Sequence, residues 1–353
     1  MTVDTPQVPA PRVVLITGGG GFLGSELAGR LAHDHSIERV IAVDSLPPDR
    51  RQRTTMGRAE FYRSDLSAAS TAAILTTARV DTVVHAAVVR DSLRAGSSAA
   101  AIKERNVLGT MQLLAACQRA ESVRRLVVKS SSAVYGSSAR DPALFTEQTA
   151  PRQLRGADGT DAVEMEGYVR GFGRRRPDVA ITTLRFANVI GPGIRTSLTD
   201  YFAMPFVPTV LGHDPRIQLL HSDDAVAVLE LAVRGQACGI VNVAAEGVLM
   251  LSQALRRVGH LPVPVPVPMV GTVGRLFRGA GLVDFSSEQI SFLDFGRVLD
   301  CTRLTEKLGY RPQWSTRQAF DDFAQSRGMR PWPERSWARA AGSGAVAVAG
   351  WWR

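Results

Sequence analysis

The sequence predicts an α/β protein with a doubly wound parallel sheet and a smaller second domain toward the C-terminus. Short apolar runs, among them residues 13–17, 40–43 and 80–85, alternate with segments of helical spacing. Strands that are apolar along their whole length are typical of parallel sheets, because helices cover both faces of such sheets. The chain of 353 residues is long enough for about two folding units.

The rhythm of strands and helices loosens after about residue 192, where proline and glycine become frequent. This change divides the chain into a first domain that holds the sheet and a second, less regular domain. The predicted parts are a disordered lead at 1–11, the first domain at 12–192 with a return segment at about 217–245, the second domain at 193–216 and 246–327, and a Trp- and Arg-rich tail at 328–353.

The composition is that of an ordinary globular protein, with 45% apolar and 21% charged residues. The three cysteines, Cys117, Cys238 and Cys301, are widely scattered, which excludes a disulfide framework and a cysteine zinc site. No metal site is expected. No apolar run reaches the ~18 residues of a membrane helix, and the N-terminus lacks the apolar stretch of a signal peptide. We therefore expect a cytoplasmic protein.

The net charge of +9 comes almost wholly from arginine, because only Lys103, Lys129 and Lys307 are lysines. A basic chain can bind nucleic acid or an anionic membrane. No nucleic-acid motif accompanies the charge, so we expect no nucleic-acid partner. An arginine-rich genome and a phosphate-bearing substrate account for the charge. The tail is open to three interpretations: contact with a membrane surface, packing on the body, or disorder.

A glycine-rich turn, Thr17-Gly18-Gly19-Gly20-Gly21-Phe22-Leu23-Gly24, follows the first predicted strand and opens a helix. Gly18 permits the tight turn, Gly21 lets the backbone approach a pyrophosphate, and Gly24 allows close packing of helix on strand. The helix N-terminus supplies free N–H groups and a positive dipole end. This context predicts a Rossmann-type dinucleotide-binding domain.

Two carboxylates follow the next two strands. Asp44 ends the second strand about 20 residues beyond Gly24, where an acid accepts hydrogen bonds from ribose hydroxyls. This position favours NAD as the cofactor, although the neighbouring arginines at 50, 51 and 53 leave NADP open. Asp65 ends the third strand and is placed to meet the adenine amino group or to cap a helix.

The ordered motifs together resemble the extended short-chain dehydrogenase/reductases, in the group of NAD-dependent epimerases and dehydratases of nucleotide sugars. The closest likeness is to UDP-glucose 4-epimerase-like proteins of actinobacteria. The resemblance runs from about Val13 to Phe323. It rests on TGGGGFLG at 17–24, HAA at 85–87, NVLGT at 106–110, SSSAVYG at 130–136, RFANVIGP at 185–192, HSDD at 221–224 and LGYRP at 308–312.

The resemblance implies roles for residues at these motifs. Ser131 would polarise a substrate hydroxyl, Ser132 would contact substrate, and Asn188 would contact the sugar-linked phosphate. Asn106 is interpreted as a stabiliser of a helix kink, and Tyr135 as a packing residue. The implied cofactor contacts are Gly18, Gly21, Phe22, Leu23, Gly24, Asp44, Asp65, Leu66, Ala86 and Ala87.

The sequence departs from the family at its catalytic pair, a Tyr-x-x-x-Lys on the helix after Ser131. With Glu166 as the register mark, the tyrosine position is Asp158 and the lysine position is Ala162; with Glu164 the two become Gly156 and Thr160. None of the five tyrosines is followed by lysine four residues later. Tyr168 comes about ten residues too late, which moves it ~15 Å along a helix and ~80° around it.

Three interpretations follow from the missing pair. Asp158 or Asp161 replaces the base; another group such as His85 or Lys129 does so; or the protein binds its ligands without turnover. We expect an NAD(P)-dependent enzyme of the UDP-hexose 4-epimerase type that acts on a nucleotide sugar. The first alternative is a catalytically silent dinucleotide-binding sensor or scaffold. A second alternative is a reductase of a steroid-like or other small carbonyl compound.

A homodimer is also expected, because the resemblance implies a four-helix bundle between two subunits. The helices would be residues 99–119 and 162–175. In the second of these, Val163, Met165, Val169 and Phe172 are candidates for the apolar contacts between subunits.

Overall fold

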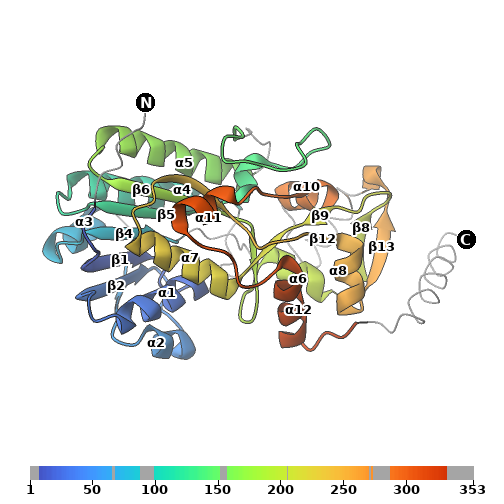
Figure 1. The fold of residues 1–353 in the computed structure, drawn as a ribbon, viewed down its shortest axis with the longest axis horizontal. Helices are drawn as coiled ribbons and strands as arrows, with labels where there is room; N and C mark the ends of the chain where they lie inside the picture. Colours follow the sequence, from blue (N-terminus) through green and yellow to red (C-terminus); the bar gives the residue numbers. More distant parts are fainter. Residues whose placement is uncertain are drawn as a thin grey trace, which may run out of the picture.

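A computed structural model describes residues 8–65, 68–87, 99–151, 157–204, 206–269, 272 and 287–331. Its centre is a sheet of seven parallel strands in the order β11-β6-β5-β4-β1-β2-β3 (Figure 1). The predicted α/β class with a doubly wound parallel sheet is therefore confirmed. The strands are β1 (Val13–Thr17), β2 (Arg39–Asp44), β3 (Glu60–Arg63), β4 (Thr82–His85), β5 (Arg125–Ser131), β6 (Ala180–Phe186) and β11 (Gly239–Val243).

Helices cover both faces of this sheet, which explains why its central strands are apolar throughout. One face carries α1 (Phe22–His33) and α7 (Ser222–Arg234), which pack on Val14 and Ile16. The opposite face packs Leu15 and its neighbours under three further helices. These are α3 (Ala68–Thr77), α4 (Ala99–Arg119) and α5 (Ala157–Arg175).

The remaining elements of the sheet-bearing part lie at its edges. The short helix α2 (Arg50–Met56) packs beside α1, and the 3₁₀ turn η1 (Ser132–Tyr135) directly follows β5. The helix α11 (Thr302–Leu308) packs near β11 and α7. Two short strands, β7 (Asn188–Ile190) and β10 (Leu219–His221), pair in parallel. They lead the chain into and out of the second part.

The second part has its own apolar core, in which Phe202 meets Phe320 edge-on at 4.9 Å between ring centroids. It lies at one end of the sheet, as Figure 1 shows. Pro262 and Pro264 lie in a strand of a two-stranded sheet, where an edge tolerates their missing N–H groups. Its elements are α6 (Ser197–Ala203), β8 (Phe206–Val210), β9 (Arg216–Ile217), β12 (Leu249–Met250), α8 (Leu251–Val258), β13 (Leu261–Val265), η2 (Val267–Met269), α10 (Ser287–Phe295), β14 (Gly296–Arg297) and α12 (Thr316–Ser326).

The HSDD motif joins the two parts. Asp224 is buried and accepts hydrogen bonds from the Tyr310 hydroxyl at 2.6 Å and from the Gln313 N–H at 2.9 Å. His221 is buried as well, stacks on Trp314 at 4.2 Å between centroids, and lies 3.1 Å from Asp322. Neither residue lines the cavity described below. Their contacts are those of a structural joint.

Both ends of the chain lie partly outside the described residues. Of the predicted lead at 1–11, residues 8–11 are described, and Val8 is buried with its backbone paired to the Gln236 side chain. Of the predicted tail at 328–353, residues from 332 onward lie outside the described part. Within the described part, no helix combines the length and the apolar character needed to cross a membrane.

Candidate functional site

A cavity of about 630 Å³ opens at the carboxyl ends of β1, β2, β4 and β5. The chain leaves β1 toward β2 on one side and later returns to β4 on the other, so this is the point where the strand order reverses. Parallel α/β sheets bind ligands at such a point. The second part closes the cavity with Leu198 of α6 and with Gln289, Phe292 and Leu293 of α10.

The glycine-rich turn forms one wall of the cavity, and its glycines are required by geometry. Gly18 has φ +79°, and a Cβ there would lie 2.8 Å from the Ala87 backbone. A Cβ on Gly24 would lie 2.1 Å from the Gly18 carbonyl oxygen. The helix α1 begins at Phe22 with Gly21 as a cap that has no side-chain bond, so its first N–H groups are left for a ligand. This cradle fits a pyrophosphate.

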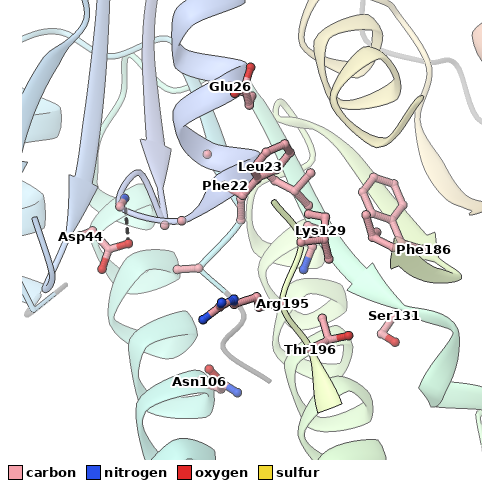
Figure 2. A pocket seen from close by; sticks show the side chains of 18 of the residues that line it. Phe22, Leu23, Glu26, Asp44, Asn106, Lys129, Ser131, Phe186, Arg195 and Thr196 are labelled. Atoms are coloured by element: carbon pink, nitrogen blue, oxygen red, sulfur yellow. Dashed lines mark hydrogen bonds between the residues drawn. The ribbon is translucent and has the colours of Figure 1, made fainter. Parts of the chain in front are cut away.

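Asp44 lies at the end of β2 beside this turn (Figure 2). Its Oδ2 accepts the Gly20 N–H at 3.0 Å and its Oδ1 accepts the Leu46 N–H at 3.2 Å. Each carboxylate oxygen keeps acceptor capacity for a further donor. Asp65 and Arg51 also line this end, whereas predicted Leu66 lies outside the described residues. The arrangement suits the hydroxyl groups of an adenosine ribose.

His85, Ala86 and Ala87 follow β4 and line the cavity as expected. Thr110 donates to the Asn106 carbonyl at 2.7 Å, so its oxygen accepts from His85 Nε2 at 2.9 Å. His85 Nδ1 then accepts the Thr17 hydroxyl at 2.8 Å. Burial, together with the charge of Lys129, lowers the pKa of His85 to about 4. Both ring nitrogens are thus engaged, and the neutral ring is a structural bridge between β1 and α4.

Three serines end β5, and their side chains point to different partners. Ser131 lines the cavity; its oxygen accepts the Ala133 N–H at 3.0 Å, which leaves its own hydrogen to donate to a ligand. Ser130 donates to Glu166 at 2.6 Å. Ser132 accepts from Arg297 at 3.3 Å and is absent from the residues that line the cavity. Ser131 is therefore the serine placed to contact a reacting group.

A buried polar network joins α5 to β5, β6 and η1. Sequence reasoning did not predict it. Glu166 of α5 binds Arg185 of β6 through two hydrogen bonds of 2.9 and 2.6 Å, and both side chains are at most 3% exposed. Arg185 also donates to Tyr135, which donates to Asn242 at 2.7 Å. Burial raises the pKa of Tyr135. Tyr135 is thus a packing residue, as expected.

The helix α5 contains the two positions at which the family's Tyr-x-x-x-Lys pair would lie. Asp158 lies in its first turn, but its side chain is outside the described part of the chain. Ala162, at the lysine position, is 7% exposed and packs in the core under the sheet. Asp161 is buried and does not line the cavity, and Tyr168 is exposed on the outer surface. Among described α5 side chains, none lines the cavity.

Other residues of the cavity come from the strand ends and from the second part. Asn188, predicted as a substrate contact, lines it at the start of β7. Arg195 and Thr196 follow the Gly-Pro turn and line it too (Figure 2). Sequence reasoning did not single these two out, although they lie only three and four residues beyond the RFANVIGP motif at 185–192. Within the described part, no cluster of His, Cys, Asp or Glu could hold a metal ion.

Comparison with known proteins places this site in a family. The model described as the NAD dependent epimerase/dehydratase family matches residues 14–244. A relative in Mycobacterium tuberculosis, which carries the name uncharacterized protein, is 49% identical over 329 residues, or 93% of this chain and 87% of its own. The UDP-glucose 4-epimerase of Yersinia enterocolitica is 28% identical over 185 residues, or 50% of this chain and 54% of its own.

Solved structures share the fold. The UDP-glucose 4-epimerase of Thermotoga maritima with UDP-glucose matches at a TM-score of 0.68 and 21% identity, over 90% of this chain and 98% of its own. The UDP-glucose-4-epimerase of Stenotrophomonas maltophila, with bound NAD and formylated UDP-arabinopyranose, matches at 0.70 and 19% over the same shares. The chain belongs to the NAD-dependent epimerase/dehydratase family.

Proposed function

We propose that the cavity binds NAD(H) together with a nucleotide sugar. The observation that carries this proposal is the cradle at the β1–α1 turn, which only glycine at positions 18 and 24 can form. Asp44 adds a carboxylate where a ribose diol would lie, which favours NAD. Arg51 lines the same end, so a 2′-phosphate would also find a cation there, and NADP stays an alternative.

The proposed reaction is reversible oxidation at C4 of a UDP-hexose. An NAD cofactor bound in the cavity would supply reversible hydride transfer with that sugar carbon within one cycle. Ser131 donates a hydrogen bond to the oxygen on that carbon, which holds it as either hydroxyl or carbonyl. Asn188 binds the phosphate linked to the sugar. Ser132, whose oxygen is held by Arg297, would contact the substrate only indirectly, through η1.

The absent tyrosine base is the main difficulty for turnover, since such a base contributes about 10²–10⁴-fold. We propose Asp158 as its replacement, because it lies at the tyrosine position of α5. The rival function is a dinucleotide-binding sensor or scaffold without turnover. The burial of Ala162, where a lysine would hold the cofactor, favours this rival. The retained Ser131 and Asn188 favour the enzyme.

The test is conversion of UDP-galactose to UDP-glucose by the purified chain with NAD added. A family member with an intact Tyr-x-x-x-Lys pair serves as the positive control. Turnover that is lost in Asp158→Asn supports both the reaction and the base. No turnover over a panel of UDP-hexoses, while dinucleotide still binds, would replace the proposed enzyme with the silent binder.

We further propose a homodimer through α4 and α5, which lie side by side on one face of the sheet. The four side chains suggested by the sequence are instead turned toward the chain's own interior. Met165, Val169 and Phe172 are buried, the last two in the core under the sheet, and Val163 is partly buried against the neighbouring core. Among the described side chains of these helices, the large exposed apolar ones are Leu108, Met111 and Tyr168, each about 40% exposed.

Light scattering tests the dimer. The wild-type chain is expected to have twice the monomer mass, and Leu108→Glu with Met111→Glu is expected to give a monomer. Leu211→Glu, at a more exposed leucine in the second part, is the control and should stay dimeric. A monomeric wild-type chain would refute the proposal.

A further inference from the structure

Lys129 is the one lysine among the described residues that line the cavity. It lies near the end of β5, two residues before Ser131, and is only partly exposed. In the view of Figure 2 its side chain lies between Ser131 and the turn residues Phe22 and Leu23. A lysine is rarely placed in such a position unless its charge meets a partner or a ligand.

The charges along the cavity are unevenly distributed. Its four carboxylates come from α1, the end of β2, the start of α2 and the end of β3, toward the proposed adenosine end. At the ends of β4 and β5 the ionisable lining groups are His85 and Lys129. His85 is held neutral by burial and by the nearby Lys129 charge, which lower its pKa to about 4. Lys129 is thus the charged side chain that the ends of β4 and β5 contribute to the cavity, while Arg195 lines it from the segment before α6.

The side chain reaches the cavity from the face of the sheet opposite to α5. Alternate residues of a strand share a face, so Lys129 lies on the same face as Val127, which packs in the core beneath α1 and α7. Ser130, the residue after Lys129, lies on the other face and donates a hydrogen bond to Glu166 of α5. The position on α5 that would hold a lysine is filled by buried Ala162. Near the reacting end, the lysine that lines the cavity is therefore on a strand, β5, and not on the helix α5.

We propose that Lys129 is the cation that faces the nicotinamide, and that its charge makes the site prefer the reduced dinucleotide over the oxidised one. The proposal rests on the proposed binding of NAD(H). The oxidised ring carries a positive charge and the reduced ring carries none, so a fixed cation beside the ring destabilises only the oxidised form. Partial burial strengthens this effect, because water screens the charges less.

The experiment measures Kd for NAD⁺ and for NADH with the full-length chain, at constant salt. In Lys129→Met, the ratio of Kd for NAD⁺ to Kd for NADH should fall about tenfold, which is about 1.4 kcal/mol. Lys129→Arg keeps the charge and should keep the wild-type ratio. Lys307→Met is the matched control, because Lys307 lies on α11 and donates to the Cys238 carbonyl, away from the cavity.

The outcomes separate this proposal from the one it rests on. A wild-type chain that binds neither form would overturn both. Binding by the wild-type chain with an unchanged ratio in Lys129→Met would overturn the role of Lys129 alone. Equal weakening of both forms would do the same, since it would place Lys129 on the phosphates. Lys129→Gln is a second variant that removes the charge. A melting curve for each variant checks that its fold is intact.

Discussion

The two ends of the cavity differ in what builds them. At the adenosine end, backbone geometry makes the site: Gly18, Gly24 and the first turn of α1 shape a cradle, and Asp44 is fixed by two backbone N–H groups. At the reacting end, Lys129 and Ser131 near the end of β5 line the cavity, and the family's Tyr-x-x-x-Lys pair is absent from α5. The dinucleotide-binding turn is thus present, whereas the catalytic Tyr-x-x-x-Lys pair is not.

Cofactor binding and the proposed chemistry thus depend on different residues of the site. Behind the reacting end, Glu166, Arg185 and Tyr135 tie α5 to β6 and η1. The Tyr-x-x-x-Lys pair, in contrast, is absent from α5.

Removal of the Glu166 carboxylate should cost the most stability, because it leaves the Arg185 guanidinium buried without its counter-ion. Breaking such a pair costs about 3–5 kcal/mol. The free energy of unfolding of Glu166→Ala in urea should fall by that amount. Glu306→Ala, which truncates an exposed glutamate of α11, is the control and should change it little. A loss below about 1 kcal/mol in Glu166→Ala would show that the network does not support this end.

Gly18→Ala should break the adenosine end. The new Cβ would meet the Ala87 backbone at 2.8 Å in a backbone conformation with φ +79°. We expect affinity for NADH to fall about 100-fold, which is about 2.7 kcal/mol. Gly309→Ala also places alanine at positive φ, but in open space at the end of α11, and isolates the cost of the conformation. If Gly18→Ala and the wild type bound NADH equally well, the turn at Gly18 would not be part of the NADH site.

His85 should make stability depend on pH. Its pKa of about 4 in the folded state lies below the ordinary 6.5, so the unfolded chain binds more protons between these values. Stability is then complete above pH 6.5 and declines as the pH falls toward 4. Urea unfolding at pH 5 should show about 2 kcal/mol less than at pH 7 from this residue.

His85→Gln should flatten that decline, whereas His35→Gln, at an exposed histidine, should leave it as in the wild type. A slope that is the same in all three chains would show that the ring is not held neutral between Thr17 and Thr110.

Asp44→Ala should weaken binding of NADH about tenfold, the effect of losing charged hydrogen bonds to a ribose diol. The same change should affect NADPH less, because the carboxylate would repel a 2′-phosphate. Titrations of both nucleotides with both chains measure this. A variant that weakens NADPH more than NADH would reverse the assignment of the cofactor.

Much of the fold and of the adenosine end could be predicted from the sequence, because both depend on local patterns. Apolar runs predicted the strands, and the glycine spacing predicted the turn after the first of them. The Glu166–Arg185 pair could not be predicted, because its partners are on different elements and only the folded sheet brings them together. The same applies to His221 and Asp224, whose partners Trp314 and Tyr310 lie about 90 residues later. The sequence suggested Lys129 as a candidate base, but only the folded strand shows that its side chain lines the cavity.

The central claim is that the chain keeps a dinucleotide site although its catalytic pair is gone. The most direct test is a calorimetric titration of the purified full-length chain with NADH. The account predicts saturable binding of one NADH per chain, with a Kd within the range of about 1 μM to 1 mM that is usual for enzyme ligands. The absence of saturable binding by NADH and by NADPH in a folded protein would contradict it.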